Sequence, residues 1–235
     1  MADVPAKLAP PALPAERAKT CALSFTAAFV DTSVFVGLFG LFTAHVTGNF
    51  VLIGSELVHA SGDVWPKLLA FPAFILAVAV AVKVSETLER RQRAPVPTLL
   101  YIEAALLLAA FAAVGTRPPG HATDATALAA GMLAAAAMGM QNAMMRLELA
   151  TLPSTTVMTV NVTQSVIDVV TMLSRADSAR HDEARRRFSR MWPPLVAFTA
   201  GAAGGALGYA LAGFSALLVP SVLCVLLGAL WRRGH

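Results

Sequence analysis

The sequence predicts an all-α polytopic membrane protein with about six transmembrane helices and two interrupted or re-entrant segments between them. Hydrophobic residues make up 57% of the 235-residue chain and charged residues only 14%, and the mean hydropathy is +0.66. A soluble domain cannot bury that much apolar surface. The apolar runs also approach the roughly 20 residues that a bilayer-spanning helix needs, which favours helices over the alternating strands of a barrel.

The chain divides into a tail and eight apolar or semi-apolar segments. Residues 1–20 are polar and rich in Pro and Ala, and we expect them to form a disordered cytoplasmic tail. The segments follow at residues 22–42, 44–60, 67–87, 97–116, 124–147, 154–174, 192–212 and 214–231.

The basic residues indicate which segments cross the membrane. Fifteen of the 18 Lys and Arg residues lie in the tail, in 83–93, in 175–190 and at the C-terminus. The positive-inside rule puts these four places, and therefore both termini, in the cytoplasm. Two cytoplasmic places must be separated by an even number of membrane crossings. Three segments lie between the tail and 83–93, and three more lie between 83–93 and 175–190. One segment of each three should therefore not cross. The most polar ones, 44–60 and 154–174, are the expected exceptions.

These two polar segments also suggest an internal repeat. Both contain Thr-x-Asn followed by an acidic residue seven positions after the Asn. The matched pairs are Thr47 with Thr159, Asn49 with Asn161, Glu56 with Asp168 and, upstream, Asp31 with Asn142. Three crossings in each half would invert the second half, as in many secondary transporters. The alternative is a chance alignment of apolar helices that carry scattered polar residues.

The repeat divides the membrane region into residues 21–120 and 121–235, with the basic cytoplasmic loop 175–190 inserted in the second half. In the motifs, Gly48 permits a backbone turn, and a neighbouring Thr or Asn can cap a new helix. Broken backbone at membrane depth must face protein or a cavity. Helix N-termini there would favour an anionic or strongly polar group.

We therefore expect Thr47, Asn49, Thr159 and Asn161 to converge on one site near the membrane centre. The full set of candidate substrate-binding residues is Asp31, His45, Thr47, Gly48, Asn49, Gln141, Asn142, Thr159, Asn161 and Gln164.

Three acids are candidates for proton or ion coupling, namely Asp31, Glu56 and Asp168. Asp31 lies in the middle of an apolar run, where a carboxylate costs roughly 2.5–3.5 kcal/mol. It should therefore face the bundle interior and pair with His45 or Arg146, or else form a structural interhelical hydrogen bond. Glu56 and Asp168 could instead be solvated at the interface. A further acid, Glu103, lies a few residues into its helix and is expected to reach the interface.

Enzyme chemistry is not expected. The sequence has no metal-ligand spacing, no nucleophile constellation and no phosphate-binding loop, so we expect neither a cofactor nor a metal. The basic runs lack an aromatic platform or groove-reading motif, so nucleic acid is not an expected partner.

Two stretches resemble one known family. They are "SFTAAFVDTSVFVGLFGLFTAHVTGNFVLIG" and "GMQNAMMRL…PSTTVMTVNVTQ", and they are similar to the YoaK-like bacterial membrane proteins (domain of unknown function 1275). The resemblance covers residues from about 20 to 232. In that family a Gly often stands at the positions of Ala28 and Val160. The resemblance implies a multi-pass protein of the bacterial inner membrane and no particular substrate.

The function expected from these patterns is a small secondary transporter or facilitator of a polar or anionic small molecule, with its site between the repeats. The alternative is a non-transporting membrane scaffold or assembly factor that uses its helix surfaces and the basic loop. The lipid bilayer and an unidentified small molecule are the expected partners, and a homo-oligomer is left open.

Overall fold

A computed structural model describes residues 14–59, 64–115, 118–174 and 177–233, and every regular element in these ranges is helical. The expected all-helical class is thus confirmed. The helices are α1 (Pro14–Gly37), α2 (Gly48–His59), α3 (Val64–Arg90), α4 (Pro95–Val114), α5 (Ala125–Leu147), α6 (Met158–Leu173), α7 (Ser178–Ala212), the short 3-10 helix η1 (Gly213–Leu217) and α8 (Leu218–Arg233).

Two sequence-based boundaries change. The expected tail overlaps α1, which already begins at Pro14, and residues 1–13 lie outside the described residues. The expected loop 175–190 is helical from Ser178 onward. Asp177 caps that helix by accepting a hydrogen bond from the Arg180 N–H at 2.8 Å, and nothing in the basic run interrupts helical backbone. Residues 175–176 lie outside the described residues.

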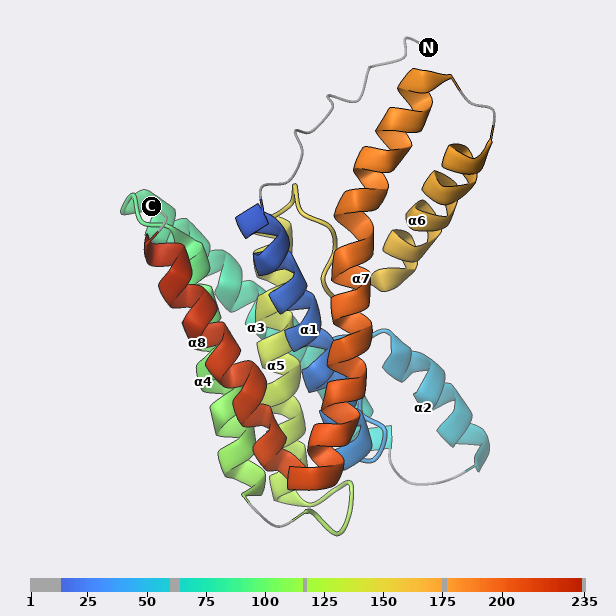
Figure 1. The fold of residues 1–235 in the computed structure, drawn as a ribbon. Helices are drawn as coiled ribbons and strands as arrows, with labels where there is room; N and C mark the ends of the chain where they lie inside the picture. The colour runs from blue at the N-terminus through green and yellow to red at the C-terminus, as the bar shows by residue number, and fades with distance from the viewer. Residues whose placement is uncertain (1–13, 60–63, 116–117, 175–176, 234–235) are drawn as a thin grey trace, which may run out of the picture.

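Five helical stretches are long and apolar enough to cross a membrane. Four of them correspond to α1, α3, α4 and α5, and the fifth runs from Ser178 to Arg232. That stretch of 55 residues folds back on itself at η1, so that α7 and α8 run antiparallel (Figure 1). By length and composition, the chain is a multi-pass membrane protein.

The two halves of the chain pack against each other through helix pairs that take one helix from each half. α1 packs most extensively on α7, and α3 packs on α5. Small residues allow the first of these contacts, as the Gly-rich run 201–213 suggests. A Cβ atom on Gly201 would lie 2.3 Å from the Phe25 carbonyl oxygen, and one on Gly205 would lie 2.4 Å from that of Phe29. The backbones of α1 and α7 therefore touch without side chains between them.

The basic segments of the chain gather at one end of the bundle, which we call the basic end (Figure 1). Arg17 Nη2 donates to Ser189 Oγ at 3.4 Å, which joins the start of α1 to the basic part of α7. Lys19 lies 4.0 Å from the centre of the Trp231 ring, and Trp231 shares a cavity with Arg93. Two contacts and one shared cavity thus bring together described residues from all four basic places.

Glu103 does not reach the interface, and that expectation is wrong. Its side chain is fully buried where α4 packs on α8, and neither carboxyl oxygen has a conventional hydrogen bond within the described residues. The Cys224 thiol, a weak donor, lies beside it. Glu103 lies near the middle of α4 and not close to its start, and α4 is apolar on all sides, so no periodicity indicates where this side chain points.

Candidate functional site

The loop after α1 doubles back along the helix that precedes it. α1 ends at Gly37, and soon after it Phe39 and Gly40 take left-handed backbone angles, with φ values of 54° and 75°. The backbone N–H groups of Thr43 and Ala44 then donate to Asp31 Oδ1 at 2.6 and 2.7 Å. Since Asp31 lies six residues before the end of α1, the loop returns about 9 Å along the helix.

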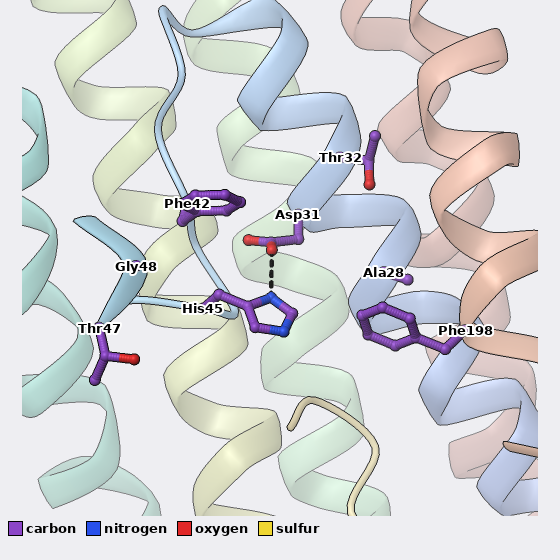
Figure 2. A pocket seen from close by; sticks show the side chains of 8 residues that line it. All are labelled: Ala28, Asp31, Thr32, Phe42, His45, Thr47, Gly48 and Phe198. Atoms are coloured by element: carbon purple, nitrogen blue, oxygen red, sulfur yellow. Dashed lines mark hydrogen bonds and ion pairs between the residues drawn. The ribbon is translucent and has the colours of Figure 1, made fainter. Parts of the chain in front are cut away.

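Asp31 holds this loop through four contacts. Besides the two backbone groups, the Thr43 hydroxyl donates to Oδ1 at 3.1 Å, and His45 Nδ1 lies 2.6 Å from Oδ2 (Figure 2). Of the two expected partners, His45 is the observed one, whereas Arg146 is exposed on α5 and does not pair with Asp31. The partners lie on the loop that follows the same helix, so these contacts are not the interhelical hydrogen bond considered above.

Asn49 braces the same loop and does not cap α2. Its Nδ2 donates to the Phe42 carbonyl at 2.9 Å, and its Oδ1 accepts from the Phe42 N–H at 3.0 Å. The side chain is fully buried. α2 begins one residue earlier, at Gly48. The Asn49 side-chain amide therefore folds back over the loop, and it bonds both the N–H and the C=O of Phe42, as a neighbouring β-strand would.

This geometry predicts a structural defect for Asn49 variants. Asn49→Ala removes both partners of the Phe42 backbone groups, which should cost roughly 2–4 kcal/mol of stability. Asn49→Asp should be worse, because its carboxylate would face the Phe42 carbonyl oxygen. Thermal unfolding in detergent tests both, with exposed Thr47→Ala as the control. A melting temperature equal to the wild type for Asn49→Ala would contradict the bracing role.

The loop after α5 repeats this arrangement. Thr156 Oγ1 donates to Asn142 Oδ1 at 2.7 Å, so this loop also returns along its preceding helix. Asn161 is buried and donates to the Ser154 carbonyl at 2.8 Å, again seven residues back. The N-cap of α6 is Val157, which has no side-chain capping bond. The expected capping by Thr159 or Asn161 is therefore wrong, and Asn161 instead reaches back to its loop as Asn49 does.

A buried lysine holds the short helix of the first half. Lys67, near the start of α3, is 2% exposed, and its Nζ lies 2.6 Å from Glu56 Oε1. The same Nζ donates to the Phe39 carbonyl at 3.1 Å. Lys67 thus connects α3 to α2 and to the unwound end of α1.

The second half uses two arginines of α7 for the same contacts. Arg187 Nη2 lies 2.9 Å from Asp168 Oδ1, and Asp168 is fully buried. Arg190 Nη2 donates to the Thr151 carbonyl at 2.8 Å. Both acids are therefore paired with cations, and the alternative in which they are simply solvated is wrong. Sequence reasoning missed the cations because the arginines were interpreted only as topology signals.

Two cavities flank the doubled-back loops. The first, of about 420 Å³, lies between α1, its loop and α7, and is lined by Ala28, Asp31, Thr32, Phe42, His45, Thr47, Gly48 and Phe198 (Figure 2). The second, of about 390 Å³, lies beside α5 and α6, with Asn142, Arg146, Thr156 and Asn161 in its lining. The His45 ring lies near the backbone of Thr156, so the two loops approach each other at this point.

The candidate residues are therefore distributed unevenly. Four line the first cavity and two line the second. Asn49 and Gln141 are buried, and both form hydrogen bonds within the protein. The Gln141 amide donates to the Leu23 carbonyl and to the Thr155 hydroxyl. Gln164 donates to Asp168 at 3.0 Å. Thr159 is exposed and lines neither of these two cavities.

Apolar helices long enough to cross a bilayer define the class as a multi-pass helical membrane protein, and its two loops double back beside two cavities. The chain belongs to the family described as protein of unknown function (DUF1275), whose model matches residues 20–230. The resemblance noted in the sequence is thereby confirmed. No curated protein and no solved structure matches the chain.

Proposed function

We propose that this protein is a small secondary transporter or facilitator of a polar or anionic small molecule, built from two inverted repeats in the inner membrane. In this arrangement α1, α3, α4, α5, α7 and α8 cross the bilayer, with both termini in the cytoplasm. α2 and α6 enter the membrane without crossing. Their 12 and 16 residues extend about 18 and 24 Å, which is less than the hydrocarbon thickness of about 30 Å.

The matched contacts of the two halves support inversion. In each half a polar residue of the long helix holds the returning loop, an Asn reaches seven residues back, and an acid on the short helix pairs with a cation of the next long helix. In Figure 1, α2 and α6 begin at mid-height and run toward opposite ends of the bundle. These paired contacts support a repeat over a chance alignment of polar residues.

The contact that carries the functional proposal is the one between the two loops. His45 pairs with Asp31 at the first cavity, and the Thr156 hydroxyl donates to Asn142 at the second, while the His45 ring lies near the Thr156 backbone. We call these four residues the polar line. A molecule that moved between the cavities would pass this line. Secondary transporters place their sites at such repeat interfaces, next to broken helices.

A cation in the second cavity and a helix N-terminus beside each cavity favour an anionic or strongly polar substrate. Arg146 lines the second cavity. The N-terminus of α2 lies next to the first cavity, and the N-terminus of α6 lies next to the second. We assign proton or ion coupling to Asp31 with His45, the titratable pair at the first cavity. Glu56 and Asp168 already have cationic partners, which favours a structural role for both.

Uptake by proteoliposomes tests this function. A panel of labelled organic anions and neutral polar solutes should reveal a substrate that the wild type concentrates or equilibrates. Arg146→Gln should then raise KM for an anion about tenfold, the value of one charged hydrogen bond. The matched control is Arg180→Gln, an exposed arginine of α7 outside both cavities.

Two outcomes would contradict the proposal. If equal effects are found for the two arginine variants, the second cavity is not on the transport path. If no solute of the panel enters liposomes containing well-folded protein, the scaffold alternative is favoured.

A further inference from the structure

A third cavity lies at the basic end, away from the doubled-back loops. It measures about 480 Å³ and lies between the α3–α4 turn, the start of α4 and the end of α8. Arg93, Thr98, Trp231 and Arg232 contribute its polar and aromatic lining. None of these residues belongs to the proposed transport path.

The two arginines of this cavity have no acidic partner among the described residues. No ion pair joins Arg93 or Arg232 to a carboxylate in that part of the chain. The Arg232 guanidinium lies 5.1 Å from the centre of the Tyr101 ring. A guanidinium stacked on a ring keeps its in-plane N–H donors available. Glu86 of α3 is paired with Lys83 at 2.9 Å and not with either of these arginines.

An apolar groove continues from this cavity along α3. It measures about 490 Å³ and shares Leu88 and Thr98 with the cationic cavity. Ala79, Val80 and Val84 form its floor, and the first two are exposed. A cationic depression therefore opens directly onto an apolar surface that a lipid chain can cover.

We propose that the cavity and groove together bind one anionic glycerophospholipid. Its phosphate would lie between Arg93 and Arg232, and an acyl chain would lie along α3 over Ala79 and Val80. Basic pockets at the ends of membrane helices recognise anionic headgroups in this way. Free phosphate would use the arginines but would leave the groove uncovered, and it is the groove that favours a lipid. The bound lipid would connect the α3–α4 turn to the end of α8.

Native mass spectrometry of the full chain, titrated with phosphatidylglycerol or phosphatidylcholine, tests this site. The wild type should bind one phosphatidylglycerol in clear preference to phosphatidylcholine. Arg93→Ala with Arg232→Ala should weaken that binding roughly thirtyfold, because each arginine near an anionic surface contributes about a factor of five. The control is Arg180→Ala with Arg185→Ala, two exposed arginines elsewhere at the basic end.

A second variant separates lipid from free phosphate and does not depend on the arginines. Ala79→Trp fills the groove from the exposed surface of α3, so it should fold and should lose phosphatidylglycerol binding. An excess of glycerol 3-phosphate should not displace the lipid from the wild type. The assignment is overturned if the control pair weakens binding equally, if phosphatidylcholine binds equally well, if Ala79→Trp binds normally, or if glycerol 3-phosphate displaces the lipid.

Discussion

Gly205→Ala is expected to abolish the stable folded state, and Gly201→Ala should do the same. The new Cβ atoms would lie 2.4 and 2.3 Å from backbone carbonyl oxygens of α1, a distance that real Cβ atoms essentially never show. Neither obstacle is a flexible side chain, so α1 and α7 would have to separate. Ser33 Oγ donates to the Gly205 carbonyl at 3.0 Å within the same contact, so that hydrogen bond would be lost as well.

The yield of monodisperse protein and its thermal unfolding in detergent check this expectation. Gly54→Ala is the matched control, since a Cβ there meets nothing within 4 Å. It should stabilise α2 by about 0.5–1 kcal/mol. If Gly205→Ala has the yield and melting temperature of the wild type, the backbone contact between α1 and α7 is wrong.

Lys67→Met is expected to have the next largest effect. It would leave the Glu56 carboxylate and the Phe39 carbonyl without their shared partner in a site where Lys67 is 2% exposed. Breaking a buried ion pair from one side costs about 3–5 kcal/mol, mostly because the remaining charge is unpaired. Thermal unfolding in detergent should show a correspondingly large loss.

The double variant Lys67→Met with Glu56→Gln separates charge from packing. It should recover much of the lost stability, because no unpaired carboxylate remains. Lys83→Met is the control for an exposed pair and should change little, since its contact with Glu86 is solvated. If the single and double variants are equally unstable, the effect of Lys67 is one of volume and not of charge.

The sequence was sufficient to predict the all-helical class, most of the helices and the gathering of the basic segments at one end of the bundle. These features depend on composition, on the length of apolar runs and on the positions of charges, each of which is averaged over many residues. It also predicted that Asp31 has a partner, since a mid-span carboxylate needs one, but it left His45 and Arg146 as alternatives, and the structure shows His45. The direction of single side chains could not be read in the same way. Asn49 was expected to face a ligand and instead pairs with Phe42, because a loop that doubles back needs its own backbone partners.

The expected single site is divided for a related reason. Each loop returns along its own preceding helix and lines a cavity of its own, and the loops approach each other where the His45 ring lies near Thr156. Sequence spacing places residues on a helix face, but it does not show that the chain reverses direction before that helix begins. The hydrogen bonds from Thr43 and Thr156 back to α1 and α5 supply that information.

Cysteine accessibility in oriented vesicles tests whether α2 and α6 enter the membrane from opposite faces. Cys21 and Cys224 are free cysteines and are first replaced by Ala. Leu57→Cys and Leu173→Cys then place single thiols on exposed positions near the ends of α2 and α6. An impermeant maleimide should label Leu57→Cys from the outside and Leu173→Cys from the cytoplasmic side. Labelling of both from the same side would contradict the inverted arrangement and the transport path built on it.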